Sequence, residues 1–121
     1  MQKRIAVADD LAFMRLILRQ IVEKEGHIVV GEASNGLEAV SLCRKTLPDL
    51  LFLDIAMPVI DGLRALERIR TLCPSVSVIM CSGLGEQDLI VRAIQLGARD
   101  FVTKPFREER IVSAMRKALC Y

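Results

Sequence analysis

The sequence has few of the residues that build zinc centres, disulfide frameworks or stacking surfaces. Only 4% of its 121 residues are aromatic, tryptophan is absent, and His27 is the sole histidine. No two cysteines form a Cys-x-x-Cys pair, and the four stand at Cys43, Cys73, Cys81 and Cys120. This pattern supports neither a zinc site nor a disulfide framework, and we expect the thiols to be buried structural residues.

The chain also lacks a strong charge of one sign. Its 17 Lys and Arg residues stand against 15 Asp and Glu residues, which gives a formal net charge of +2. The basic residues are scattered among acidic ones, whereas a nucleic-acid-binding module normally concentrates them on one element. The composition therefore argues against direct binding of nucleic acid.

Long apolar runs and flexible linkers are absent as well. No run approaches the ~18–20 apolar residues that span a bilayer, and the opening segment MQKRIAVADD turns acidic where a signal peptide would stay apolar. We therefore expect a cytoplasmic protein with no membrane insertion. Because no Gly/Ser-rich linker interrupts the chain, residues 1–121 are predicted to form one domain, too short for a (β/α)₈ barrel of about 250 residues.

Aliphatic residues are abundant, and 52% of the chain is hydrophobic. Short apolar runs alternate with longer segments of helical period, and the runs are Ile5–Ala8, Ile28–Gly31, Leu50–Leu53, Val76–Cys81 and Phe101–Val102. Near-continuous apolar strands separated by helices are typical of a parallel sheet covered on both faces. The pattern predicts a doubly wound α/β fold with five strands flanked by five helices. If the second strand lies at an edge, the strands take the flavodoxin-like order 2-1-3-4-5.

The helical segments carry apolar stripes and recognisable ends. Asn35 and Asp61, each followed by glycine, open two segments, and Gly26 and Gly97 end two others. In the segment 11–26 we predict a stripe of Phe13, Leu16, Ile17 and Ile21, with Arg15, Arg19 and Glu23 facing solvent. The later stripes are Leu37, Val40 and Cys43; Leu66, Ile69 and Leu72; Leu89, Ala93, Ile94 and Leu96; and Ile111, Met115, Ala118 and Leu119.

Four of the five apolar runs are followed at once by residues that could act on a ligand. They are Asp9 and Asp10 after the first, Asp54 after the third, Ser82 after the fourth and Lys104 after the last. Ligands bind at the carboxyl ends of strands in open α/β sheets, so these side chains should share one crevice. Carboxylates without histidine or cysteine suit Mg²⁺, which completes its octahedron with water and phosphate oxygens. The sequence thus predicts a phosphoryl site with Asp54 as acceptor, Lys104 as counter-charge and Ser82 as hydrogen-bond donor.

Each of these residues has a simpler interpretation when it is taken alone. Asp9 and Asp10 could cap the helix that follows them. Asp54 and Ser82 could be ordinary turn or loop residues, and Lys104 could be a solvated lysine. The combination at four strand ends is what favours the phosphoryl site.

This combination resembles a known family. The receiver domains of two-component response regulators share the pattern, and the segments VADDLAFMRLILRQI and GARDFVTKPF are especially similar to the single-domain chemotaxis members; the matching positions are Asp9, Asp10, Asp54, Ser82 and Lys104-Pro105. The resemblance covers the whole chain. It implies the five-stranded fold predicted above and a signalling phosphoacceptor rather than a true enzyme.

The resemblance also implies roles for individual residues. Asp54 would accept a phosphoryl group from the phosphohistidine of a sensor histidine kinase, Lys104 would contact that group, and Ser82 would move toward it. A partner-binding face would then switch, and its target would be a phosphorylation-dependent partner such as the flagellar motor switch. Mg²⁺ would be held by Asp9, Asp10, Asp54 and the backbone carbonyl of Ala56.

The family pattern marks three further positions. Its switch aromatic falls at Phe101, where many members carry tyrosine, although Phe101 alone would be interpreted as a core residue. A phenylalanine offers no hydrogen bond to a partner. Ala56 and Leu84 occupy positions that tune dephosphorylation, and neither carries a polar group to orient water, so we expect a long-lived phosphoaspartate.

Other functions fit the sequence less well or remain open. The chain could be the receiver fragment of a longer regulator with a DNA-binding or enzymatic output domain. A magnesium-dependent aspartyl-phosphate phosphatase of the haloacid dehalogenase type would carry Asp-x-Asp after its first strand, where this chain reads Asp9-Asp10-Leu11. A dinucleotide-binding fingerprint begins at Gly83-Leu84-Gly85, but Asp88 stands at its third glycine position, and no phosphate-binding GxxxxGK[ST] motif is present.

Overall fold

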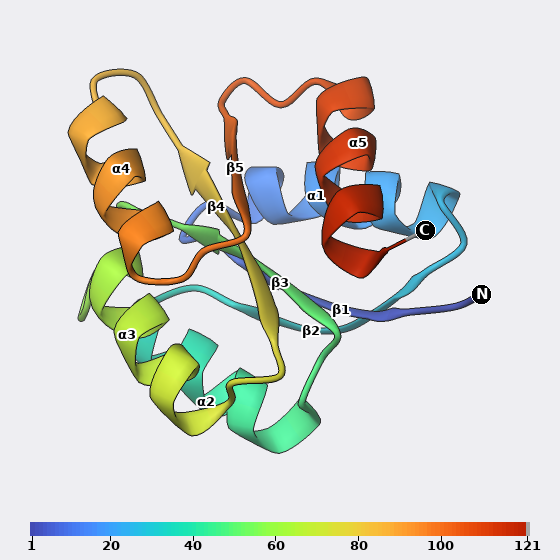
Figure 1. Ribbon diagram of the computed structural model, residues 1–121. Helices are drawn as coiled ribbons and strands as arrows, with labels where there is room; N and C mark the ends of the chain where they lie inside the picture. Colours follow the sequence, from blue (N-terminus) through green and yellow to red (C-terminus); the bar gives the residue numbers. More distant parts are fainter. Residues whose placement is uncertain (121) are drawn as a thin grey trace.

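The computed structural model describes residues 1–120 and contains one parallel sheet of five strands. The strands run in the order β2-β1-β3-β4-β5, which confirms the predicted topology (Figure 1). Their bounds are β1 Arg4–Ala8, β2 Ile28–Ala33, β3 Leu50–Asp54, β4 Ser77–Ser82 and β5 Asp100–Thr103. The carboxyl ends of β1, β3, β4 and β5 therefore meet at one edge of the sheet.

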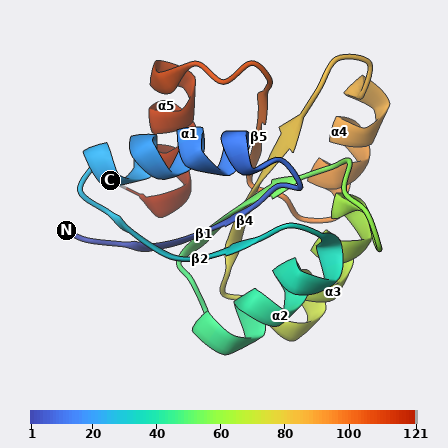
Figure 2. The ribbon, with the colours of Figure 1, turned by 180° about the vertical axis from the view of Figure 1, so that it is seen from behind.

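Five helices cover the two faces of this sheet. They are α1 Ala12–Lys24, α2 Gly36–Thr46, α3 Gly62–Leu72, α4 Gln87–Gln95 and α5 Glu108–Leu119. Helices α1 and α5 lie on one face, and α2, α3 and α4 lie on the other, as both views of the ribbon show (Figures 1 and 2). Within residues 1–120, no helix is both long enough and apolar enough to cross a membrane.

The sheet separates two hydrophobic cores. Successive strand residues point to opposite faces, so Val7 and Phe52 pack with α1 and α5, whereas Ala8 and Leu53 pack with α2, α3 and α4. All five residues of the central strand β3 are buried. This strand is therefore a rigid support for whatever stands at its carboxyl end.

Local sequence signals set several helix ends as predicted. The Asn35 side chain accepts a hydrogen bond from the Glu38 amide, and the Asp61 side chain accepts one from the Arg64 amide, so both residues cap their helices. Gly26 and Gly97 follow α1 and α4 with φ angles of +87° and +107°, which glycine adopts at little cost.

The predicted buried stripe of α1 is partly wrong. Phe13 and Leu16 are 67% and 48% exposed, whereas Ile21 is buried as predicted, and Leu18 and Val22 are the other buried residues of the helix. The segment is apolar on more than one side, so the 3.6-residue period allows two stripes and only packing against α5 and the sheet selects one. Four leucine and isoleucine residues expected to be buried are likewise largely exposed: Leu37, Leu72, Leu89 and Ile94.

Two smaller expectations also need correction. Cys120 is exposed, whereas Cys43, Cys73 and Cys81 are buried as predicted. Arg15 and Arg19 do not simply face solvent, because both form ion pairs with Glu32 on the edge strand β2.

Candidate functional site

The strand ends bring the predicted residues together. Single carboxylate oxygens of Asp9, Asp10 and Asp54 all lie within 4.8 Å of one another. Lys104 Nζ lies 3.0 Å from Asp9 Oδ2 and 3.3 Å from Asp54 Oδ1. Ser82 ends β4 beside them, and its carbonyl accepts a 2.8 Å hydrogen bond from the Lys104 amide. Three carboxylates and one ammonium group therefore occupy the crevice predicted from the sequence.

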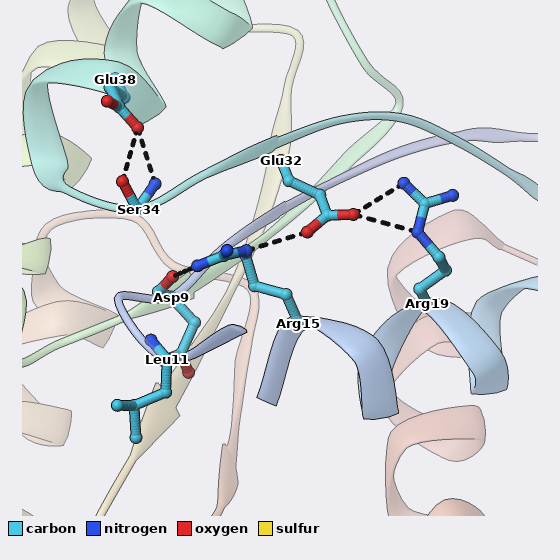
Figure 3. Close-up of polar contacts among 7 residues, drawn as sticks. All are labelled: Asp9, Leu11, Arg15, Arg19, Glu32, Ser34 and Glu38. Carbon is cyan, nitrogen blue, oxygen red and sulfur yellow. Dashed lines mark hydrogen bonds and ion pairs between the residues drawn. The ribbon is translucent and has the colours of Figure 1, made fainter. Parts of the chain in front are cut away.

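Asp9 is fixed by the turn that leads into α1 (Figure 3). Its Oδ1 accepts a 2.9 Å hydrogen bond from the Leu11 amide, and its backbone carbonyl accepts a 2.6 Å bond from Arg15 Nη1. The residue at the N-cap position of α1 is Leu11, without a side-chain cap. Asp9 is fully buried, and because Leu11 stands at the N-cap position, the simpler interpretation of Asp9 as the helix cap is wrong.

Asp54 is held on the last residue of the buried strand β3. The following Ile55 amide donates to the Cys81 carbonyl, and the Ile55 carbonyl accepts a 2.7 Å bond from the Gly62 amide. A Cβ atom at Gly62 would collide with the Asp54 backbone carbonyl. The loop from β3 to α3 therefore closes tightly behind Asp54, and glycine at 62 is a steric requirement.

The electrostatics of the cluster oppose full ionisation. Burial, followed by the charge of Asp9, raises the pKa of Asp54 to about 6, and Lys104 offsets only part of this rise. Burial lowers the pKa of Lys104, but its ion pairs with Asp9 and Asp54 outweigh this effect and leave that pKa above its ordinary value. Lys104 is therefore charged at neutral pH, and one cation faces three carboxyl groups.

The donor set fits a hard divalent cation. Among the described residues, the cluster consists of carboxylate oxygens and includes no sulfur or imidazole nitrogen. The buried Asp9 Oδ2 makes an ion pair with Lys104 but no hydrogen bond with residues 1–120. Asp10, by contrast, is exposed and leaves one side of the cluster open to solvent.

Ser82 also has unused bonding capacity. Its side chain is fully buried, and its Oγ has no hydrogen-bond partner among the described residues. A buried hydroxyl without a partner is costly in free energy. The neighbouring Lys104-Pro105 peptide bond, whose isomer the sequence leaves open, is cis.

A pocket of about 470 Å³ opens between α4 and β5 next to the cluster. Phe101 and Lys104 form part of its wall, as do Leu84 and Ile90. Phe101 is half-buried rather than a closed core residue, and the Arg110 guanidinium lies 5.8 Å from the centre of its ring. Leu84 is 95% exposed at the rim of this pocket.

Ala56 lies two residues after Asp54 in the loop that leads to α3, and it is exposed. Within residues 1–120, no contact is seen between the Ala56 carbonyl and the carboxylate cluster. The role of Ala56 as a metal ligand therefore stays a prediction.

A polar network that was not predicted from the sequence supports the rim of the site. Arg15 donates to the Asp9 carbonyl and, through Nε, to Glu32 at 2.8 Å, while Arg19 binds the other Glu32 oxygen at 2.8 Å (Figure 3). Together, Arg15 and Glu32 tie the turn after β1 to the edge strand β2. The sequence feature that could have indicated this network is Glu32, a charged residue within an otherwise apolar strand.

Comparison with known proteins places this geometry in a family. The model of the response regulator receiver domain matches residues 5–116. The chain is a response regulator receiver domain. Receiver domains are phosphorylation-activated modules of two-component signalling systems, so this one has a kinase partner and downstream targets.

Relatives of this receiver domain include chemotaxis proteins. It is 44% identical to the chemotaxis protein CheY of Bacillus subtilis, covering 98% of this chain and 99% of that protein. It is 43% identical to the CheY of Thermotoga maritima, covering 97% and 98%. The CheY in a crystal structure of a CheX-CheY-BeF₃-Mg²⁺ complex from Borrelia burgdorferi superposes with a TM-score of 0.91 at 30% identity, covering 95% of this chain and 87% of that one.

Proposed function

We propose that residues 1–121 form one chemotaxis-type receiver domain in which Asp54 accepts a phosphoryl group from the phosphohistidine of a sensor histidine kinase. The observation that carries this proposal is the position of Asp54, on a buried strand end and 3.3 Å from Lys104 Nζ. A rigid carboxylate beside a fixed cation is what in-line phosphoryl transfer requires.

Transfer proceeds with the following changes in bonding. An oxygen of the Asp54 carboxylate forms the new O–P bond as the P–N bond to the kinase imidazole breaks, and the imidazole nitrogen leaves with the electron pair. Lys104 neutralises negative charge on the equatorial phosphoryl oxygens, and the Ser82 hydroxyl donates a hydrogen bond to one of them. The unpartnered Ser82 Oγ supports this role, because phosphorylation would give a buried donor its acceptor.

The metal ligands in this proposal are Asp9, Asp10, Asp54 and the backbone carbonyl of Ala56. Bound Mg²⁺ would supply positive charge in addition to that of Lys104 and so balance the surplus of carboxylates. The all-oxygen cluster supports this assignment, as does the Mg²⁺ named for the similar CheY of Borrelia burgdorferi.

Phosphorylation is read out on the face formed by α4 and β5. Ser82 moves toward the phosphoryl group together with the loop between β4 and α4. The Phe101 ring then turns into the space that this movement opens. The pocket beside Phe101 supports this rearrangement, because a ring can enter it without opening the core. Since Phe101 has no hydroxyl group, a partner recognises its shape rather than a hydrogen bond.

The output is a phosphorylation-dependent partner, with the flagellar motor switch as the first candidate because the curated relatives above are chemotaxis proteins. A receiver segment of a longer regulator with a separate output domain is the second candidate. A cytoplasmic location remains a prediction from the sequence.

The acceptor is tested by intact-mass analysis after incubation with acetyl phosphate and Mg²⁺. We expect one added phosphoryl group, which disappears in Asp54→Asn and with a chelator. Asp61→Asn is the matched control, because it makes the same change at an exposed helix cap that asparagine can also fill. Modification that persists in Asp54→Asn would refute the assignment.

The readout is tested with Phe101→Ala. This variant should be phosphorylated at the same rate but should lose phosphorylation-dependent binding to a peptide from the flagellar motor switch protein. Binding of the unphosphorylated and phosphorylated wild type with equal affinity would exclude this output and favour the second candidate.

A further inference from the structure

A second hollow lies away from the phosphoryl site, between α2 and α3. Its volume is about 630 Å³. Three apolar side chains, three cations and one serine line it: Leu37, Val40, Leu72, Arg44, Lys45, Arg68 and Ser41. None of these residues belongs to the carboxylate cluster or to the pocket beside Phe101.

The apolar part of this groove is open to solvent. Leu37 and Leu72 are 44% and 50% exposed, although other apolar residues of the same helices, such as Val40 on α2 and Leu66 on α3, are buried. No segment of residues 1–120 covers them. Exposed leucines that share a hollow are characteristic of surfaces that bind a partner.

The cations of the groove carry uncompensated charge. Arg44, Lys45 and Arg68 make no ion pair and no side-chain hydrogen bond with other described residues. The acidic side chains of the same two helices do not neutralise them: Glu38 binds Ser34, and Glu67 borders an adjacent hollow without pairing with Arg68. Basic residues that are scattered in the sequence are thus gathered by the fold into one surface.

We propose that this groove binds an amphipathic helix of a partner protein, one that carries acidic residues beside an apolar stripe. The leucines would receive the stripe, and the three cations would face carboxylates along its edges. Nucleic acid fits less well because the centre of the groove is aliphatic, with neither an aromatic stacking surface nor a basic floor. Two copies of this chain joined groove to groove would place cations against cations.

The test uses a synthetic helical peptide of about 18 residues with glutamates flanking a leucine stripe. Binding is measured by fluorescence anisotropy at about 50 mM and about 300 mM salt, and its location by amide chemical-shift changes in the labelled protein. We expect shifts concentrated in residues 36–46 and 62–72, with weaker binding at the higher salt. The Arg44→Glu/Arg68→Glu variant should bind about tenfold more weakly or worse, since two attractions become repulsions.

A charge-matched control separates a local effect from a change in net charge. Arg99→Glu/Lys117→Glu alters two exposed cations that do not line the groove, and its affinity should stay within about twofold of the wild type, less than ~0.4 kcal/mol. Asp54→Asn should also bind normally, so a failure of the phosphoacceptor assignment leaves this test intact. The proposal is overturned if no peptide binding is detected, or if the shifts map elsewhere. It is also overturned if replacing Leu37 and Leu72 by serine leaves the affinity for the peptide unchanged. Displacement of the peptide by a single-stranded oligonucleotide would overturn it too. So would sedimentation of the wild type as a dimer that is lost in Arg44→Glu/Arg68→Glu.

Discussion

At the scale of single residues, the site is organised by side chains whose partners lie far away in sequence. Lys104 is half-buried against two aspartates that precede it by 95 and 50 residues, and its ion pairs with them raise its pKa despite the cost of burial. Ser82 carries a buried hydroxyl that has no hydrogen-bond partner within residues 1–120. Such groups are destabilising unless a ligand completes them, which is the signature of a functional site rather than of a structural one.

Ala56 is the residue on which we expect the lifetime of the phosphorylated form to depend. Its methyl group cannot orient water, so Ala56→Asn should hydrolyse its phosphoaspartate faster, by about tenfold. Decay of the added phosphoryl mass after removal of acetyl phosphate measures this rate. Ala56→Val is the control and should decay as slowly as the wild type. Decay of the wild type faster than that of Ala56→Asn would contradict the prediction.

Val59 shows local strain in the loop between β3 and α3. It has a φ angle of +72°, which β-branched residues rarely adopt, and its side chain is 67% exposed. Val59→Asn should therefore raise the free energy of unfolding by about 0.5–1 kcal/mol, because asparagine tolerates the left-handed region. Chemical denaturation checks this gain, and Val59→Thr, which keeps the branch at Cβ, should show none.

At the scale of elements, the strand ends and the loops behind them place the chemistry. The strand β3 is buried on both faces, and the loop after it returns so closely that Gly62 touches the Asp54 backbone. The turn after β1 is tied to β2 through Arg15 and Glu32. These contacts hold the carboxylates close together although their charges repel one another.

Gly62→Ala tests this close approach. A methyl group at 62 would push the loop from the Asp54 carbonyl, so we expect a loss of about 1–3 kcal/mol in unfolding free energy. We also expect slower phosphorylation of the folded fraction by acetyl phosphate. The control is Gly83→Ala, where an added Cβ meets only Glu86 Oε1 at 3.6 Å. If both substitutions lower the unfolding free energy equally, the loss comes from replacing a glycine as such and not from the close packing at position 62.

At the scale of the whole molecule, the small net charge does not reveal how unevenly the charged residues are distributed. A net charge of +2 conceals an acidic cluster at one edge of the sheet and a cationic groove between α2 and α3. Because both features arise from residues of different elements, each depends on the folded state. Stability and cation binding should therefore be linked.

Mg²⁺ should raise the melting temperature of the wild type, because it binds the folded cluster and screens the repulsion between its carboxylates. At about ten times the dissociation constant the gain is about 1.4 kcal/mol, or a few degrees. Asp10→Asn should be more stable than the wild type without Mg²⁺ and should gain less when it is added. Thermal denaturation at constant ionic strength measures both effects, and Asp61→Asn should respond like the wild type. A gain in Asp10→Asn equal to that of the wild type would remove Asp10 from the ligand set.

The sequence by itself determined the five alternating strands and helices and the helix starts at Asn35 and Asp61, because these follow from local periodicity. Once the second strand is placed at an edge, the meeting of four polar strand ends follows from the geometry of parallel sheets. Only the tertiary structure decided which stripe of α1 is buried, since Phe13 and Leu18 are equally apolar and packing alone distinguishes them. It also decided the network of Arg15 and Glu32 and the groove between α2 and α3. These depend on contacts between residues distant in sequence, and no local pattern encodes which charges will be compensated and which will be left exposed.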